Sequence, residues 1–505
     1  MTPIADSGVQ NAFLFAPAHE LQAKLEAEEI TSVELVGLFL EQIERHNYRF
    51  NAVISTAPSE IAIARAEELD KERKAGQVRG KLHGIPVIVK DAVVTDASLG
   101  MITTAGSHAI ATLKAKRNAS CITKMLEAGM VILGKGNMTE FCGLKSNNTP
   151  VGWSAYGSQT LSPYRRDDLE EEHQPTAGGS SSGPAVSILA GFSPLGIATE
   201  TTGSTVYPSS TNGLYGMKPS PDSIDNDGLW KLSDSFDGVG VMARDPTDLA
   251  ALIELLLKPE VLAKLPEGGH EASLKKNWQG LRIGMVDINW GSPGEASKSK
   301  WSRSDVKASY EQAAKKIGEL ADKVIYPLDI PQADVLTYNG RDLGKIAYYE
   351  YSEEIRKFLL NFHPDSKVDS LKGLVEWNKE HADIELPEPY NTQTELIACL
   401  EPNMTAKEHT ETLAALRRLA TTDGMGKWMD DHDIDIILSN SDSTLVTFAA
   451  CAKWPIGTVP LGNAAKNDQP FGLFALAREG REDILLHFMS AFHATFTGPK
   501  PPSIK

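Results

Sequence analysis

HQPTAGGSSSGPAVSILAGFSPLGIATETTGSTVYPSSTNGLYGMKPS, the sequence of residues 173–220, places two clusters of small residues around a short apolar segment. The first cluster is residues 178–183 and the second is residues 201–204. Glycine adopts positive φ and allows the main chain to approach a ligand closely. Backbone N–H groups left free in such turns can hold an anion or an oxyanion. The stretch therefore predicts a site built largely from backbone, with serines on both turns.

A buried strand that ends in a lysine precedes this stretch. Residues 83–91 read HGIPVIVKD, a β-branched run that stops at Lys90 and Asp91. Strands buried on both faces have this composition, and ligands gather at the carboxyl ends of strands in open α/β sheets. Burial lowers the pKa of a lysine and can make it the base that a nucleophilic serine needs. Lys90 is therefore a candidate base, whereas Asp91 is expected to form an ion pair or to cap a helix.

Helix and strand patterns alternate along the rest of the chain. Thr31 and Glu34 form a capping box ahead of apolar residues at helical spacing. We expect one large α/β domain over residues 1–505, with a central mixed, mostly parallel sheet covered by helices on both faces. Further helices are predicted at residues 59–74, 120–128 and 305–323, and strands at residues 51–55, 130–133, 281–287, 324–330, 433–439 and 456–461.

Three regions are distinguished within this single domain. The core that carries the site motifs spans about residues 80–250. A polar, helical section at about residues 340–430 suits a peripheral cap over one face. Residues 151–174 contain Gly, Ser, Pro and a charged run, and they are predicted to form a surface loop or insertion beside the first glycine-serine cluster.

Composition narrows the classes of function. The 505 residues carry a formal net charge of −17, and an acidic chain without a dense basic stripe argues against nucleic acid as a partner. The four cysteines have no C-x-x-C spacing and fit a reducing compartment. The N-terminus lacks the features of a secretory signal, and no apolar run is long enough to span a bilayer. We expect a cytoplasmic protein without a membrane span, and a homodimer is left open.

The ordered set of motifs resembles the amidase signature family, whose members hydrolyse amide bonds with a Ser–cis-Ser–Lys triad. The likeness runs from about Leu21 to Phe492. A single glycine-serine cluster would be a weak signal, but the order of the motifs and the 24 residues between Ser180 and Ser204 make the match specific. The matching segments are residues 83–91, 178–183, 199–204, 213–220, 237–244 and 455–462.

The resemblance assigns a role to each site residue. Ser204 would be the nucleophile, and Ser180, preceded by a cis peptide bond, would relay its proton to neutral Lys90. Ser181 and Gly179 would support the site. No metal or organic cofactor would be needed. The N–H groups that would stabilise the tetrahedral oxyanion are those of Thr201, Thr202, Gly203 and Ser204.

Three departures from the family pattern bear on the substrate. Thr202 stands where glycine is usual, which adds bulk near the oxyanion hole. Val206 stands where many members have an arginine that binds a substrate carboxylate, so a neutral or apolar small-molecule amide is favoured. The insertion before Gly178 lengthens the spacing between Lys90 and Ser180 and could shape the entrance.

Four other functions are alternatives to a hydrolytic amidase. Residues 179–183 match G-x-S-x-G, so an α/β-hydrolase-type esterase would use Ser181 with His487 or His493. That alternative is disfavoured because the preceding segment is polar rather than a strand. An acyltransferase or amide-forming enzyme with the same triad stays open. The glutaminase subunit of a tRNA-dependent amidotransferase is disfavoured by Val206, and an inactive scaffold by the presence of all three triad residues.

Other polar residues are assigned to structure rather than chemistry. Lys218 is predicted to be structural, and Arg244 is predicted to pair with a carboxylate. The twelve histidines show no H-x-x-x-H spacing, and His432 is expected in an exposed turn, so no metal site is predicted.

Overall fold

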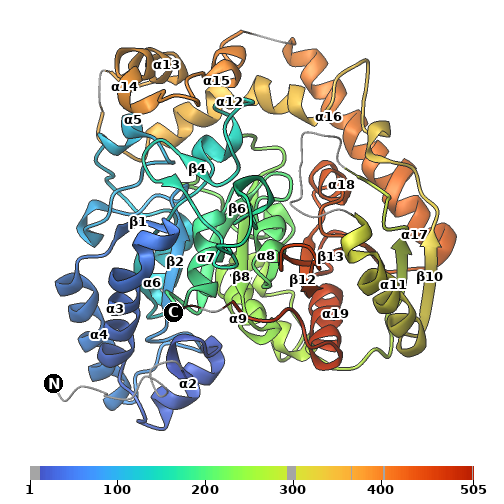
Figure 1. The fold of residues 1–505 in the computed structure, drawn as a ribbon, viewed down its shortest axis with the longest axis horizontal. Helices are drawn as coiled ribbons and strands as arrows, with labels where there is room; N and C mark the ends of the chain where they lie inside the picture. The colour runs from blue at the N-terminus through green and yellow to red at the C-terminus, as the bar shows by residue number, and fades with distance from the viewer. Residues whose placement is uncertain (1–11, 293–302, 365–366, 402–403, 503, 505) are drawn as a thin grey trace.

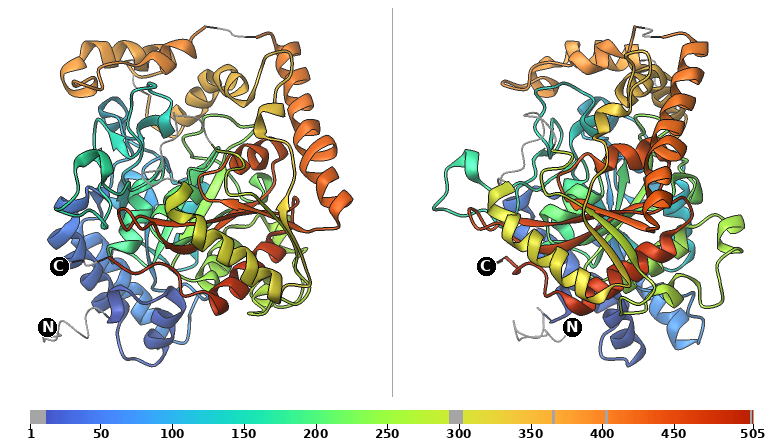
Figure 2. Two further views of the ribbon diagram at one scale, coloured as in Figure 1. Left: turned by 45° about the vertical axis from the view of Figure 1, so that its right-hand side comes forward. Right: turned by 90° about the vertical axis from the view of Figure 1, so that its right-hand side faces the viewer.

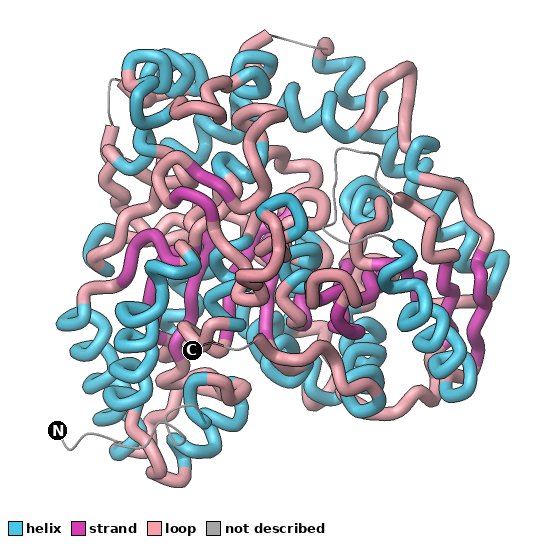
Figure 3. Tube along the Cα trace, viewed as in Figure 1, coloured by secondary structure: helices cyan, strands magenta, loops and turns pink. Residues whose placement is uncertain are grey.

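The computed structural model describes residues 12–292, 303–364, 367–401, 404–502 and 504. Within them an eleven-stranded sheet has the order β1-β3-β2-β6-β8-β7-β12-β13-β11-β9-β10. Figure 3 shows helices surrounding these strands. The strands are β1 (Val53–Thr56), β2 (Pro86–Lys90), β3 (Val131–Gly136), β6 (Leu195–Glu200), β7 (Tyr215–Lys218), β8 (Gly238–Ala243), β9 (Arg282–Val286), β10 (Lys323–Leu328), β11 (Ile436–Asn440), β12 (Ile456–Asn463) and β13 (Pro470–Leu476), with β4 (Trp153–Ser154) and β5 (Ser158–Gln159) forming a separate hairpin.

The strand directions confirm a mixed sheet and correct one detail of the prediction. Parallel pairing is confined to β3-β2-β6 and to β11-β9-β10. All pairs from β6 across to β11 are antiparallel, as is β1 with β3. The expectation of a mostly parallel sheet was therefore wrong. Its basis was the alternation of helix and strand, but β12 and β13 are joined by only a short loop, and such a connection produces an antiparallel pair.

The structure confirms the predicted bounds of one helix, α4, and the predicted start of another, α3. The helix α4 coincides with the prediction, and the Thr31 hydroxyl accepts the Glu34 N–H at 3.2 Å to start α3. The helices are α2 (Ala18–Glu26), α3 (Ser32–Phe50), α4 (Ser59–Lys74), α5 (His108–Ala111), α6 (Ser120–Glu127), α7 (Ser182–Leu189), α8 (Val206–Thr211), α9 (Pro246–Leu256), α10 (Pro259–Leu262), α11 (Arg303–Leu320), α12 (Leu343–Leu359), α13 (Leu371–Glu380), α14 (Ala382–Glu385), α15 (Thr394–Ala398), α16 (Ala406–Ala420), α17 (Gly426–His432), α18 (Leu445–Ala452) and α19 (Glu482–Thr495).

The helices α12 to α17 occupy the section expected to form a cap. Figure 1 shows α12 to α15 along the top of the view and α16 and α17 down its right-hand side, and Figure 2 shows the same band from two other directions. An aromatic cluster joins this section to the core, because the Trp230 ring stacks on Phe141 at 4.8 Å and meets Phe358 of α12 at 4.9 Å. The cap-like section is therefore packed directly onto the loops around the sheet.

A buried ion cluster makes a second connection between the cap-like section and the core. Lys145 Nζ lies 2.7 Å from Glu140 Oε1 and 3.8 Å from Glu385 Oε1, at the end of α14. All three side chains are fully buried. Burial and the neighbouring Glu385 carboxylate raise the pKa of Glu140 well above its usual range, while the Lys145 ammonium opposes that rise. The ammonium therefore compensates two carboxyl groups at once.

Lys145→Met is expected to lower the free energy of unfolding by about 3–5 kcal/mol, because removing one partner leaves buried charge uncompensated. Urea unfolding followed by circular dichroism measures the change. Lys372→Met is the matched control, since Lys372 is 75% exposed and pairs with Glu376 on a helix surface, where such pairs contribute about 0.3–0.5 kcal/mol. Equal, small losses in the two variants would contradict a stabilising role for Lys145.

Candidate active site

The Lys90 side chain lies at the centre of the candidate site. It ends β2, which pairs in parallel with β3 on one side and β6 on the other. Every side chain of β2 is buried, so both faces of this strand are covered. Lys90 Nζ donates hydrogen bonds to Ser180 Oγ at 2.7 Å, to Thr199 Oγ1 at 2.9 Å and to the Thr199 carbonyl at 3.2 Å. The amine is therefore held by neutral oxygen atoms.

The surroundings of Lys90 favour its neutral form. Burial lowers the pKa of Lys90, and the Cys142 thiol, Asp237 and Glu200 only oppose this change. The hydrogen bond to Ser180 can then run in either direction, because a neutral amine accepts a proton whereas an ammonium only donates. This is the electrostatic condition for a lysine to act as a general base.

The first glycine-serine cluster forms the turn that begins α7. The Gly179–Ser180 peptide bond is cis, as the resemblance implied. The Ser180 carbonyl accepts the Thr139 N–H at 3.0 Å, and the Ser181 hydroxyl donates to the Thr199 carbonyl at 3.3 Å. A Cβ at Gly179 would lie 2.7 Å from the Thr139 hydroxyl oxygen. Gly179 therefore leaves room for the close approach of the neighbouring loop.

The second cluster lies against the first one. The Ser181 N–H donates to the Ser204 carbonyl at 3.2 Å, which joins the two turns directly. Ser204 is half-buried and follows Gly203, whose φ of +90° requires glycine. In the part of the chain that is described, the N–H groups of Thr202, Gly203 and Ser204 donate to no other residue. A half-buried hydroxyl beside free backbone donors is the arrangement that an oxyanion hole requires.

The carboxylate of Glu200 holds the far side of this turn. Its Oε2 accepts the N–H groups of Thr205 at 2.7 Å and Val206 at 3.0 Å. The Val206 side chain is fully buried in an apolar cluster that includes Phe236 and Phe448. Val206 therefore supplies no charge at this turn, and its side chain is part of the core beneath the site.

Two charged residues of the matched segments have structural contacts. Asp91 is buried, accepts the Thr104 N–H at 3.0 Å and lies 3.8 Å from Lys135 Nζ, as the ion-pair prediction required. Arg244 donates to the Ile188 carbonyl and lies over the Phe15 ring, so the expected carboxylate partner was wrong. Burial lowers the pKa of Arg244 to about 10, consistent with its position between a carbonyl and an aromatic ring.

The contacts of the serine and histidine residues contradict the esterase interpretation. No strand precedes Ser181 within the described residues 174–181, so the strand–turn–helix context is missing. His487 Nε2 lies 2.8 Å from the Asn277 carbonyl oxygen. His493 Nδ1 lies 3.1 Å from the Tyr215 hydroxyl, and its Nε2 lies 3.3 Å from Asp245. Neither ring is bonded to Ser181.

Two residues at the site were missed by the sequence analysis. Thr199 binds Lys90 through its carbonyl and its hydroxyl, and the half-buried Cys142 thiol lies 3.9 Å from the Thr199 hydroxyl oxygen. A signal for Thr199 existed, because it stands near the end of a buried strand within a matched segment. Cys142 has no such signal. Among the described residues, no group of His, Cys, Asp and Glu side chains could hold a metal ion.

Further features of the structure bear on the predictions for segment 151–174, for His432 and for a membrane span. The segment 151–174 contains the hairpin β4–β5, and its acidic residues 167–168 and 170–172 are exposed. His432 is half-buried at the end of α17 rather than in an exposed turn. None of the described helices combines the length and the apolar composition that crossing a bilayer requires.

A family model described as amidase matches residues 34–486, so the chain belongs to the amidase family. This confirms the resemblance and identifies the chain as a member of a class of hydrolases that act on carbon–nitrogen bonds. A protein of Arabidopsis thaliana named as a probable amidase is 28% identical, over 96% of this chain and 91% of its own length.

Solved structures give the same result for the fold. The peptide amidase from Stenotrophomonas maltophilia superposes with a TM-score of 0.85 at 28% identity, over 97% of this chain and 99% of that chain. A 6-aminohexanoate cyclic dimer hydrolase, 20% identical with a TM-score of 0.71 over 96% of this chain and 97% of its own, shares the fold. The α/β class with one large mixed sheet is thereby confirmed.

Proposed function

We propose that this protein is a serine amidase that cleaves neutral or apolar, linear small-molecule amides through an acyl-enzyme on Ser204. The observation that carries the proposal is the 2.7 Å hydrogen bond between Lys90 Nζ and Ser180 Oγ. A fully buried lysine with a lowered pKa is bonded there to a serine whose neighbour, Ser181, is bonded to the Ser204 carbonyl. Base, relay and nucleophile are thus assigned to Lys90, Ser180 and Ser204.

Acylation begins with attack of Ser204 Oγ on the amide carbonyl carbon. The Ser204 proton passes to Ser180 Oγ as the Ser180 proton passes to Lys90 Nζ, which becomes an ammonium. The carbonyl π electrons move to oxygen and form the tetrahedral oxyanion. The free N–H groups of Thr202, Gly203 and Ser204 stabilise this charge, and the N–H of Thr201 is assigned to the same oxyanion hole.

Collapse of the tetrahedral intermediate breaks the carbon–nitrogen bond. The Lys90 ammonium returns a proton through Ser180 to the departing nitrogen, and the amine leaves with both bond electrons. Water then attacks the Ser204 ester and loses a proton through Ser180 to Lys90. Release of the carboxylic acid returns Ser204 to its hydroxyl form and Lys90 to its neutral form.

The residues around the second cluster support an uncharged substrate. Val206 provides no cation at the position where an arginine would bind a carboxylate. A Cβ at Gly203 would contact Val446 of α18 at 3.5 Å and Tyr207 at 3.9 Å, so apolar surface borders the turn. Because the peptide amidase is a structural neighbour, peptide amides belong among the candidate substrates.

We also place the enzyme in the cytoplasm, since its four cysteines are unpaired.

The choice of substrate is tested with matched pairs of amides. An aryl or alkyl amide is expected to be hydrolysed with a kcat/KM about 10-fold or more above that of its carboxylate-bearing analogue, which finds no cationic partner and loses about 1.4 kcal/mol or more. Ammonia release measures both rates. Equal rates would contradict the preference for neutral substrates.

Hydroxylamine separates hydrolysis from acyl transfer in the same assay. Hydroxamate formed from the acyl-enzyme competes with acid formed by water. Acid as the main product at millimolar hydroxylamine supports a hydrolase. Quantitative conversion to hydroxamate at that concentration would favour the acyltransferase alternative, which uses the same triad.

A further inference from the structure

A buried lysine holds the oxyanion turn from behind. Lys218 is the last residue of β7 and is fully buried. Its Nζ donates to the Thr201 carbonyl at 2.9 Å and lies 3.8 Å from Glu200 Oε1. The lysine predicted to be structural therefore touches the first peptide unit of the turn that precedes Ser204.

Because the peptide group is planar, this contact fixes the direction in which the Thr202 N–H points. The Thr201 carbonyl and the Thr202 N–H belong to one trans peptide unit and point in opposite directions. The Lys218 amine, bonded to the carbonyl on one side, directs the Thr202 N–H to the other side. It also polarises the unit, since hydrogen bonds in series strengthen one another in a medium of low dielectric constant. The Thr202 N–H then becomes a stronger donor.

The Lys218 side chain lies among ionisable groups that act on it in opposite directions. Burial lowers the pKa of Lys218, and the carboxylates of Glu200 and Asp237 are the main groups that oppose this change. Arg417 lowers the pKa of Lys218 further, and Cys451 opposes it. Glu200 in turn binds the N–H groups at the far end of the turn. The two ends of the turn are thus held by one buried ion pair.

Asp237 lies just before β8 and is the second carboxyl group that opposes the lowering of the Lys218 pKa. Its Oδ2 accepts the Leu232 N–H at 2.8 Å, and its own N–H donates to the Ser233 carbonyl at 3.1 Å. Burial raises the pKa of Asp237 to about 6, with Thr201 and Lys218 among the groups that oppose the rise.

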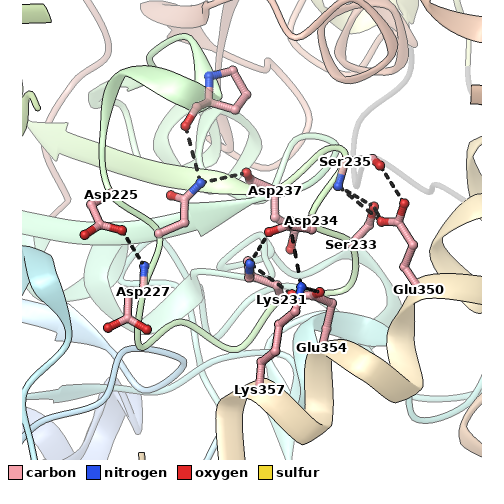
Figure 4. A network of polar contacts seen from close by, with 12 residues as sticks. Asp225, Asp227, Lys231, Ser233, Asp234, Ser235, Asp237, Glu350, Glu354 and Lys357 are labelled. Atoms are coloured by element: carbon pink, nitrogen blue, oxygen red, sulfur yellow. Dashed lines mark hydrogen bonds and ion pairs between the residues drawn. The ribbon is translucent and has the colours of Figure 1, made fainter. Parts of the chain in front are cut away.

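The loop that carries Asp237 is anchored to the cap-like section. Figure 4 shows Glu350 of α12 bonded to Ser233 and Ser235, and Lys231 bonded to Glu354. The Lys231–Glu354 distance is 2.9 Å. Polar contacts therefore connect α12, through Ser233, to Asp237, whose carboxyl group opposes the lowering of the Lys218 pKa.

We propose that Lys218 is a positioning residue for the oxyanion hole, whose side-chain amine, through its hydrogen bond to the Thr201 carbonyl, orients and polarises the Thr201–Thr202 peptide so that the Thr202 N–H meets the developing oxyanion. This inference rests on the proposed function, in which Ser204 attacks an amide carbonyl. Lys218 itself touches neither the substrate nor the reacting atoms.

Lys218→Met tests this role because it keeps a buried side chain of similar length and removes the amino group. We expect kcat to fall about 100-fold, in the range for loss of one oxyanion-hole donor, with KM changed less than about 3-fold. A trifluoromethyl ketone analogue of the substrate, which forms a tetrahedral adduct, should bind about 100-fold more weakly. An analogue of similar shape that lacks the ketone, and therefore forms no tetrahedral adduct, should bind the variant as tightly as it binds the wild type. The acidic limb of the pH profile, which reports the ionisation of Lys90, should lie at the same pH in the variant and in the wild type.

Lys135→Met is the matched control. Lys135 is also a fully buried lysine on a strand of the sheet, β3, and it also donates to a main-chain carbonyl, that of Val93. Within the described part of the chain it makes no polar contact with the oxyanion turn, and it bonds instead to Thr103 Oγ1 at 3.0 Å. We expect Lys135→Met to lose stability while keeping kcat within about 5-fold and the affinity for the ketone analogue unchanged.

The outcomes separate this proposal from the proposed function. A folded Lys218→Met enzyme with wild-type kcat and ketone affinity would overturn the positioning role, as would an equal loss in Lys135→Met. If Lys218→Met does not fold, Lys218→Gln retains a donor without charge and should lose about 10-fold in kcat; an unchanged kcat there would also overturn it. Full activity of Ser204→Ala would instead contradict the proposed function.

Discussion

Ser204→Ala is expected to lower kcat/KM by about 10⁴-fold or more and to abolish labelling by a fluorophosphonate. The variant removes the atom that forms the acyl-enzyme, and Ser180 cannot take over the attack while its hydroxyl is bonded to Lys90 Nζ at 2.7 Å. Residual turnover would come from the backbone donors alone. Rates of ammonia release, together with peptide mapping of the labelled wild-type protein, measure both effects.

Ser181→Ala is the control for this prediction. Its hydroxyl donates to the Thr199 carbonyl at 3.3 Å, so its removal should disturb the support of Lys90 and reduce kcat/KM by about 10-fold, the size of one neutral hydrogen bond. Labelling on Ser204 should persist in this variant. Loss of labelling in Ser181→Ala with near-normal turnover in Ser204→Ala would restore the esterase interpretation.

Lys90→Met is expected to lower kcat by several orders of magnitude and to remove the acidic limb of the pH profile. Only the neutral amine accepts the proton from Ser180, so wild-type activity should rise with pH through the pKa of Lys90. Burial lowers that pKa from 10.5, and the limb should therefore lie below the range of an ordinary lysine. The pH dependence of kcat/KM measures the limb, and the double variant with Ser180→Ala should lose little more than either single variant.

The same substitution has a defined effect on stability. Below its folded-state pKa, Lys90 is charged in both the folded and the unfolded chain, and burial of that charge opposes folding in full. Between the lowered pKa and 10.5 the unfolded chain binds more protons, so the free energy of unfolding of the wild type rises with pH. The wild type should therefore gain stability relative to Lys90→Met across that window in urea titrations. A constant difference would contradict the lowered pKa.

Much of the fold follows from local patterns in the chain. The β-branched run before Lys90 predicts a strand buried on both faces, and β2 has all five side chains buried. The capping box at Thr31 and the boundaries of α4 are likewise local, because they depend on hydrogen bonds and propensities within a few residues. The serines of the site were identified from two glycine-rich turns and the order of the motifs.

Other features depend on contacts between distant segments. Strand direction was predicted incorrectly, because pairing depends on which segments meet and not on the alternation of elements. The partner of Arg244 was also wrong, since a carbonyl and a ring lie where a carboxylate was expected. Thr199 was missed because its role arises only when β6 pairs beside β2.

Residue order thus determines that Lys90 ends a buried strand and that Ser180 and Ser204 lie on turns, because burial and turn chemistry are read from neighbours in the chain. Only the packed sheet brings Lys90 to Ser180, Ser181 to Ser204 and Lys218 beneath Thr201, across 90, 23 and 17 residues of sequence. The chemistry of the candidate site depends on those contacts, since a lysine acquires a lowered pKa and a peptide unit a fixed direction only in the desolvated interior.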